Sequence, residues 1–184
     1  MLGLDFLDTR PIVVALAGSN GAGMSTFFES HLSGCGLRFV NADEIAGQLM
    51  IGPYEAAEAT AAIRPALIER GESFVFETVL SDSIGEKVDL LAQYASSDYE
   101  VVMIFICISD IVTSIKRVSI RASQGGHDVP DEKLQTRFSR TQANLERTIQ
   151  RLPHVLVFDN SDLGRPHQLV EHYRDGERVG DSSH

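Results

Sequence analysis

The chain has 184 residues, of which 43% are hydrophobic and 23% are charged, and its formal net charge at pH 7 is −10. This length and composition are those of one globular domain with a sizeable core, or of one domain with a lid. The acidic net charge argues against binding to nucleic acid or to an anionic membrane surface. The sequence shows no signal peptide and no apolar run near the ~20 residues of a membrane span, and its two cysteines suit free thiols in a reducing compartment. We therefore expect a soluble, cytoplasmic protein.

The first predicted strand leads into a glycine-rich loop with the spacing of a phosphate-binding loop. The apolar run at 11–17 is typical of a strand buried on both faces, and 25–32 has the pattern of a short helix. Strand, glycine loop and helix together predict a nucleotide held on backbone N–H groups, with an ordinary glycine-rich turn as the alternative. The loop residues are Gly18, Ser19, Asn20, Gly21, Ala22, Gly23, Met24, Ser25 and Thr26.

Met24 occupies the position at which the pattern G-x-x-x-x-G-K-[ST] requires a lysine. In that pattern the lysine contacts the β- and γ-phosphates, and the following hydroxyl, here that of Ser25, binds Mg²⁺. The loop therefore predicts nucleotide binding, while the methionine leaves open whether this chain catalyses a reaction.

The rest of the chain alternates strands with helices. Short apolar segments predict strands at 37–40, 73–76, 101–108 and 155–158, and helical patterns cover about 54–70, 84–95, 111–123 and 131–151. Five strands separated by helices predict a doubly wound, mostly parallel α/β sheet. We expect a single domain over 1–173, with a helical lid at about 117–140, and a polar, disordered tail over 174–184.

Polar side chains follow three of these strands at the edge where ligands bind in such sheets. Asp43 can accept a proton from an acceptor hydroxyl or hold Mg²⁺ through water; alternatively, it or Asn41 can cap the next helix. Glu77 closes an apolar strand, where a charge is costly unless it faces an open site; the alternative is a solvated strand end. Asn160 follows the last strand and lies at the same edge.

Arginines are concentrated on two predicted helices that flank a glycine-containing loop. Inward arginines on either side of a flexible loop can close on a triphosphate and neutralise charge on the transferring phosphoryl group. The alternative is a solvated face with pairs to Glu132 or Glu146. His127, in the loop, is either an acceptor contact or an exposed side chain. The arginines are Arg117, Arg121, Arg137 and Arg140.

Taken together, these motifs resemble those of the zeta toxin family over nearly the whole chain, from about 12 to 161. The resemblance implies a P-loop NTPase fold and an ATP- and Mg²⁺-dependent kinase that phosphorylates a sugar hydroxyl. In that family the acceptor is UDP-N-acetylglucosamine, and some members are neutralised by a small antitoxin protein. The matching segments are Gly18–Thr26, Asn41–Ala46, Phe76–Ser81, Arg117–Val118, Gly125–Pro130 and Asp159–Ser161.

The same resemblance implies roles for individual residues. Asp43 takes the position of the general base, Ser25 that of the Mg²⁺ ligand, and Arg121 and Arg137 those of the phosphate clamps. Met24 stands at the lysine position. The acceptor would contact Asp43, Glu77, Thr78 and His127, and ATP would contact residues 18–26, Arg117 and Asn160.

Three interpretations of Met24 follow. It can be a disarming substitution in an active, toxic kinase, since methionine matches the lysine stem without its charge. The chain can instead be a natural pseudo-kinase, a nucleotide-binding regulatory module without turnover. Finally, a nearby arginine such as Arg38 or Arg117 can supply the missing charge.

Overall fold

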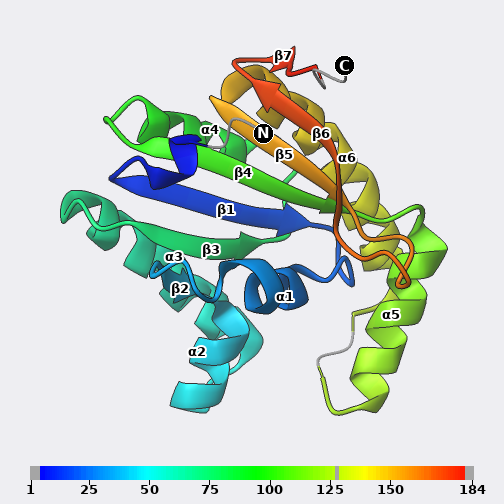
Figure 1. Ribbon diagram of the computed structural model, residues 1–184. Coiled ribbons are helices and arrows are strands. Elements are labelled where there is room, and N and C mark those ends of the chain that lie inside the picture. The colour runs from blue at the N-terminus through cyan, green and yellow to red at the C-terminus, as the bar shows by residue number, and fades with distance from the viewer. Residues whose placement is uncertain (1–4, 127–128, 181–184) are drawn as a thin grey trace.

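The computed structural model describes residues 5–126 and 129–180, which form a seven-stranded sheet covered on both faces (Figure 1). The strand order is β2-β3-β1-β4-β5-β6-β7. The strands are β1 (Ile12–Gly18), β2 (Arg38–Val40), β3 (Phe74–Thr78), β4 (Glu100–Cys107), β5 (His154–Asp159), β6 (Gln168–Arg174) and β7 (Glu177–Arg178). The first five run parallel, which confirms the predicted doubly wound sheet.

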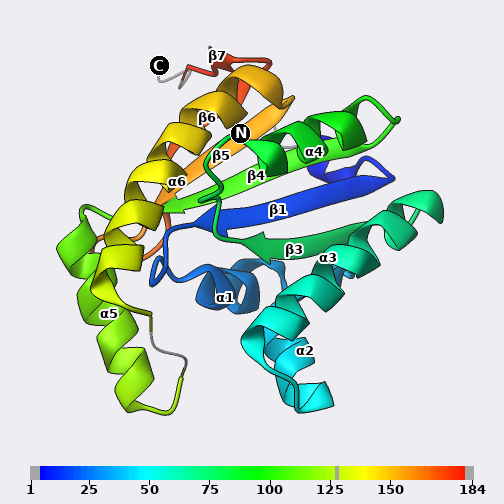
Figure 2. The same cartoon turned by 180° about the vertical axis from the view of Figure 1, so that it is seen from behind.

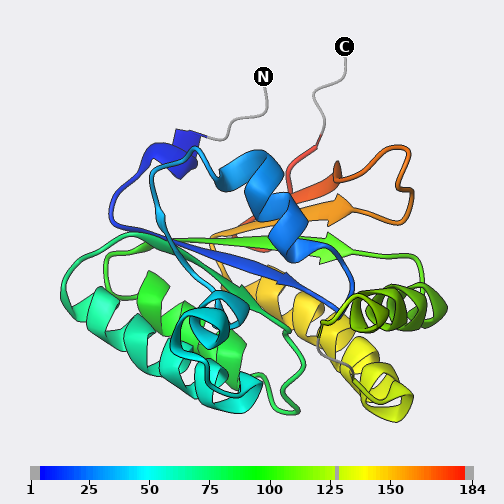
Figure 3. The same ribbon diagram turned by 90° about the horizontal axis from the view of Figure 1, so that it is seen from below.

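The helices lie in two layers. Figure 3 shows α1 on one face of the sheet, and α3, α4 and α6 on the other, with α2 beside α3; Figure 2 shows this second layer from its outer side. The helices are α1 (Met24–Phe27), α2 (Ala42–Leu49), α3 (Pro53–Glu69), α4 (Glu86–Ala95), α5 (Ile111–Ser123) and α6 (Asp131–Arg151), with the short turns η1 (Asp5–Asp8) and η2 (Phe28–Leu32).

The core consists of two apolar layers because β1 is buried along its whole length. Alternate side chains of a strand point to opposite faces. Val13, Ala15 and Ala17 belong to the layer beneath α3, α4 and α6. Val14 and Leu16 belong to the layer on the α1 side. The uninterrupted apolar run of this strand follows from burial on both faces.

Two strands were not predicted from the sequence. β6 pairs antiparallel with β5, and β7 pairs antiparallel with β6 within the segment expected to be a disordered tail. The predicted number of five strands is therefore too low. Most β6 side chains are exposed or half-buried, so its sequence lacks the apolar run that marked the parallel strands. By pairing with β5, β6 supplies hydrogen-bond partners for backbone groups that would be unpaired at the edge of a five-stranded sheet.

Candidate functional site

The phosphate-binding loop runs from the end of β1 over the carboxyl edge of the sheet into α1. Two of its glycines are demanded by the geometry: a Cβ on Gly18 would lie 2.6 Å from the carbonyl oxygen of Ile106 in β4. Gly23 has φ +93°, and a Cβ there would lie 2.6 Å from Nδ2 of Asn160. The first turn of α1 leaves N–H groups without helical partners, as anion binding requires. The α-helix is shorter than predicted, because residues 28–32 form a π turn.

Side chains from outside the loop hold three consecutive loop carbonyls. The Ser114 hydroxyl on α5 donates to the carbonyl oxygen of Asn20 at 2.6 Å. Arg117 Nη1, also on α5, donates to that of Gly21 at 3.4 Å, and Asn160 Nδ2 donates to that of Ala22 at 2.7 Å. Because these carbonyl oxygens accept hydrogen bonds from side chains outside the loop, the backbone N–H groups of the loop are left to face an anion.

Arg117 also ties the loop to the end of β5. Its Nη2 donates to the carbonyl oxygens of Asn160 at 2.9 Å and of Ser161 at 3.3 Å. The predicted nucleotide contacts Arg117 and Asn160 therefore lie against the loop. Arg38, by contrast, starts β2 level with Val13 of β1 and pairs with Glu72 at 3.5 Å. It lies about 16 Å along the sheet from Gly18, at ~3.3 Å per residue, so the idea that Arg38 replaces the missing lysine is wrong.

Asn41, and not Asp43, caps α2. The Asn41 side-chain oxygen accepts from the backbone N–H of Asp43 at 2.7 Å and of Glu44 at 3.1 Å. Asp43 is the second residue of the helix, so its carboxylate is not used by the cap. The interpretation of Asp43 as a helix cap is therefore wrong, and its carboxylate is available to a ligand.

Glu77 lies among the other predicted site residues rather than at a solvated strand end. Burial raises the pKa of Glu77 to about 7, the nearby Ser25 hydroxyl lowers it, Asp43 raises it further, and Arg121 and Asn41 lower it. Its Oε1 is buried without a hydrogen-bond partner in the described part of the chain. The structure thus brings Glu77, Asp43, Ser25 and Arg121 together. Thr78, the next residue of β3, is buried, and strand alternation places its side chain on the opposite face of the sheet, the face of Phe74 and Phe76.

The two predicted arginine-bearing helices are present as α5 and α6, but their four arginines differ in surroundings. The charge of Arg121 lowers the pKa of Glu77, whereas the charge of Arg137 lowers the pKa of Lys87 on α4. Arg140 is exposed. Within residues 5–126 and 129–180, none of the four arginines forms an ion pair with a carboxylate, so pairs to Glu132 or Glu146 are not seen. His127 lies outside the described residues.

A profile of the zeta toxin family matches residues 53–167. The chain belongs to the zeta toxin family. The matched segment includes Glu77, both arginine-bearing helices and Asn160. The phosphate-binding loop and Asp43 precede it.

Solved structures share this fold. A chain of the AvrRxo1-ORF1:AvrRxo1-ORF2 complex with ATP has a TM-score of 0.72 at 16% identity, covering 97% of this chain and 64% of its own. The PezAT toxin–antitoxin system of Streptococcus pneumoniae has a TM-score of 0.59 at 14% identity (95% and 75% covered). Shikimate kinase from Acinetobacter baumannii has 0.53 at 14% identity (78% and 83%). No significant match was found among curated proteins. The zeta toxin chain described here thus spans less than two thirds of the AvrRxo1 chain.

The oxygen groups of this zeta toxin site fit a magnesium ion held mainly by a bound triphosphate. Mg²⁺ prefers oxygen ligands and is commonly held by one or two protein groups plus substrate phosphates. The Ser25 hydroxyl next to the orphaned Glu77 Oε1, with Asp43 nearby, supplies such groups. Among the described residues, no cluster of three or more His, Cys, Asp or Glu could hold a metal by itself.

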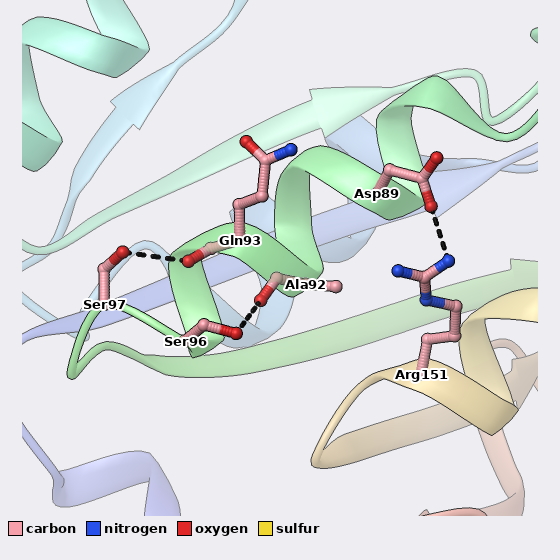
Figure 4. A pocket seen from close by; sticks show the side chains of 6 residues that line it. All are labelled: Asp89, Ala92, Gln93, Ser96, Ser97 and Arg151. Carbon is pink, nitrogen blue, oxygen red and sulfur yellow. Dashed lines mark hydrogen bonds and ion pairs between the residues drawn. The ribbon is translucent and has the colours of Figure 1, made fainter.

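A large surface hollow elsewhere on the molecule is unrelated to this site. It has a volume of about 700 Å³ and lies between α4 and the end of α6 (Figure 4). Four of its polar side chains already have partners: Arg151 pairs with Asp89 at 2.7 Å, and the Ser96 and Ser97 hydroxyls donate to carbonyls of their own helix. Among the described residues, no helix combines the length and the apolar character that crossing a membrane requires.

The capping geometry gives a first test. We expect Asn41→Ala to lower the free energy of unfolding by about 1 kcal/mol, because two N–H groups of α2 lose their acceptor. Asp43→Asn should cost less than about half of that, since only a helix-dipole interaction is weakened. Urea unfolding of both variants measures the difference. An equal loss in Asp43→Asn would show that the Asp43 carboxylate has a structural role.

The raised pKa of Glu77 gives a second test. A folded pKa of about 7 against an unfolded value of 4.5 means that stability is lost as the pH rises from 4.5 to 7. We therefore expect Glu77→Gln to be more stable than the parent at pH 8, by on the order of 1–3 kcal/mol, and to lose this advantage towards pH 4.5. Unfolding at pH 5 and pH 8 checks this, with the exposed Glu58→Gln as control. A Glu77→Gln effect independent of pH would contradict it.

Proposed function

We propose that this protein is built as a kinase that transfers the γ-phosphate of ATP to a hydroxyl of a small acceptor. One observation carries the proposal: the held phosphate loop lies at the same sheet edge as the group formed by Glu77, Asp43, Ser25 and Arg121. A phosphate cradle, two carboxylates and an arginine at one edge supply the parts that phosphoryl transfer uses. Membership of the zeta toxin family supports the same reaction class.

Within this proposal, each residue has a role that its surroundings permit. Loop amides at 18–26 hold the phosphates, and Asp43, free of the helix cap, accepts the proton of the acceptor hydroxyl. Glu77 orients the acceptor, and Arg121 and Arg137 neutralise charge on the transferring group. Bound Mg²⁺, next to Ser25, would neutralise the β- and γ-phosphates.

We propose a nucleotide sugar, in the first place UDP-N-acetylglucosamine, as the acceptor, and a small antitoxin as a partner protein. The resemblance to the zeta toxin family supports this choice of acceptor. The partner is suggested by relatives crystallised as AvrRxo1-ORF1:AvrRxo1-ORF2 and described as the PezAT toxin–antitoxin system.

We further propose that Met24 leaves this chain with little or no turnover. Met24 is half-buried and packs against the apolar layer on the α1 side, so no charge is brought to the phosphates from this position. Arg117 is a poor substitute, because its guanidinium already donates to Gly21, Asn160 and Ser161. The second candidate function, a nucleotide-binding module without catalysis, rests on this same feature.

Restoring the lysine separates the two functions. We expect Met24→Lys to raise the rate of phosphate transfer from ATP to UDP-N-acetylglucosamine by about 10²–10³-fold, as for other preorganised donors to a transition state. In that background, Asp43→Asn should abolish most of the transfer and leave ATP affinity unchanged. Radiolabelled γ-phosphate transfer to UDP-sugars, nucleosides and nicotinamide nucleotides measures both. ATP binding without transfer to any of these acceptors by Met24→Lys would favour the regulatory module.

A further inference from the structure

A buried histidine lies against the backbone of the phosphate-binding loop. His167 is the last residue of the connection from β5 to β6, and it is only 8% exposed. Its Nε2 lies 3.7 Å from the position that a Cβ on Gly23 would take. Figure 1 shows this connection beside the loop that leaves β1. The imidazole therefore reaches the residue that comes directly before Met24.

Three aromatic rings hold His167 in this place. Phe27 of α1 meets it edge-on, with 5.1 Å between the ring centroids, and His31 meets it edge-on at 5.3 Å. His31 in turn stacks on Phe27 at 4.6 Å. The backbone of His167 has φ +54°, a left-handed conformation that is uncommon for a residue other than glycine. Packing of the rings thus fixes the imidazole at the start of α1.

The His167 ring carries a nitrogen that the fold does not use. Its Nε2 is buried without a hydrogen-bond partner among the described residues, whereas nearly all buried polar groups in proteins are paired. A neutral imidazole has one donor and one acceptor nitrogen, and a protonated one has two donors and a positive charge. The ring can therefore take up a proton at a point that adjoins the phosphate loop.

Burial and positive neighbours keep His167 neutral in the ligand-free protein. Burial lowers the pKa of His167, and the charge of His31, on η2, lowers it further. The polar backbone of Gly23 raises this pKa, and the charge of Arg117, on α5, lowers it. Because the ordinary pKa of histidine is already below 7, the neutral ring predominates at neutral pH.

The other elements around His167 do not neutralise a charge on it. On α1 and at the end of β5, the uncharged Phe27 and Asn160 adjoin the ring. Asp162 and Arg165, in the same connection, pair with each other at 3.3 Å. Within residues 5–126 and 129–180, His167 forms no ion pair with a carboxylate. A negative charge that favours the imidazolium must therefore come from a ligand.

A triphosphate on the loop supplies that negative charge. With one Mg²⁺ bound, a triphosphate still has a net negative charge, and a nearby opposite charge favours the protonated form of histidine. In the usual pattern the lysine at position 24 brings a positive charge to the phosphates, and Met24 brings none. An imidazolium at His167 would place a positive charge against the same stretch of the loop.

We propose that His167 takes up a proton from the solvent when a triphosphate binds to the loop, and that its imidazolium supplies part of the positive charge that Met24 lacks. His167 is then a positioning residue, since it acts through the loop and touches no reacting atom. The inference rests on the nucleotide binding of the proposed function and is independent of phosphate transfer. It makes the affinity for ATP depend on pH near neutrality.

Proton uptake during binding tests this inference. Mg²⁺–ATP, with excess Mg²⁺ and no acceptor, is titrated by calorimetry into the unmodified protein at pH 7 in PIPES and in Tris, whose ionisation enthalpies differ. The difference between the two binding enthalpies gives the number of protons exchanged. We expect an uptake of about half a proton per site, and an affinity about tenfold higher at pH 6 than at pH 8.

Matched variants assign the proton to a residue. His167→Gln should abolish the uptake and the pH dependence, while its affinity at pH 8 stays within about threefold of the parent, which is also neutral there. His172→Gln is the control: this buried histidine of β6 lies 5.8 Å from the Phe6 ring, and its loss should leave the uptake unchanged. Met24→Lys should at least halve the uptake, because the lysine charge neutralises the phosphates and repels an imidazolium.

Every outcome decides the inference. Uptake that disappears in His167→Gln, with the affinity at pH 8 kept, supports it. Binding without proton uptake overturns it, as does uptake that persists in His167→Gln and disappears in His31→Gln, which would assign the proton to His31. Weak binding by His167→Gln at every pH would show a merely structural role and also overturns it, as does an unmodified protein that binds no ATP. The kinase proposal is decided separately, by phosphate transfer in Met24→Lys, and either can fail while the other stands.

Discussion

The site depends on how the phosphate loop is held. Ser114, Arg117 and Asn160 each take one of three consecutive loop carbonyls, and they come from α5 and from the end of β5. A glycine-rich loop has high conformational entropy when free. These three hydrogen bonds reduce it from outside, and none of them involves the side chain at position 24. The cradle is therefore set before a nucleotide arrives and does not need the lysine that the pattern lacks.

Helix α5 contributes to the site in two ways. Its inner face carries Ser114 and Arg117, which hold the loop, and its last turn carries Arg121, whose charge acts on Glu77. A movement of α5 would change the loop and the acidic group together. Arg117 thus has a positioning role that its sequence pattern, which suggested a lid cation, does not reveal.

The charges around β3 are divided between the two faces of the sheet. Glu77, with Asp43 nearby, faces the α1 side, whereas Arg64 and Lys87 lie towards α3 and α4. The sheet therefore separates these carboxylates from the two cations. Glu77 Oε1 and Arg64 Nε are each buried without a hydrogen-bond partner among the described residues.

Much of the fold and of the phosphate-binding loop could be predicted from the sequence, because the parallel strands and the loop carry strong local patterns. The apolar run of β1 and the spacing of Gly18 and Gly23 predicted the fold and the loop. The role of Ser114 could not be predicted, since a single serine in a helical pattern carries no such signal and its contact with Asn20 arises only when α5 packs against the loop. β6 and β7 were missed because edge strands with exposed side chains carry no apolar run. The choice between Asn41 and Asp43 as cap likewise needed the observed hydrogen bonds.

All of the proposed roles require that this loop binds a nucleoside triphosphate although Met24 replaces the lysine. Hydrogen exchange of the unmodified protein, with and without Mg²⁺–ATP, tests it most directly. We expect slower exchange on ATP addition at 18–26 and also at 117–140, where arginine–phosphate bonds would form only with the nucleotide present. Protection at 18–26 alone would remove the lid role of the arginines. Unchanged exchange at 18–26 at millimolar Mg²⁺–ATP would show that the loop does not hold the nucleotide.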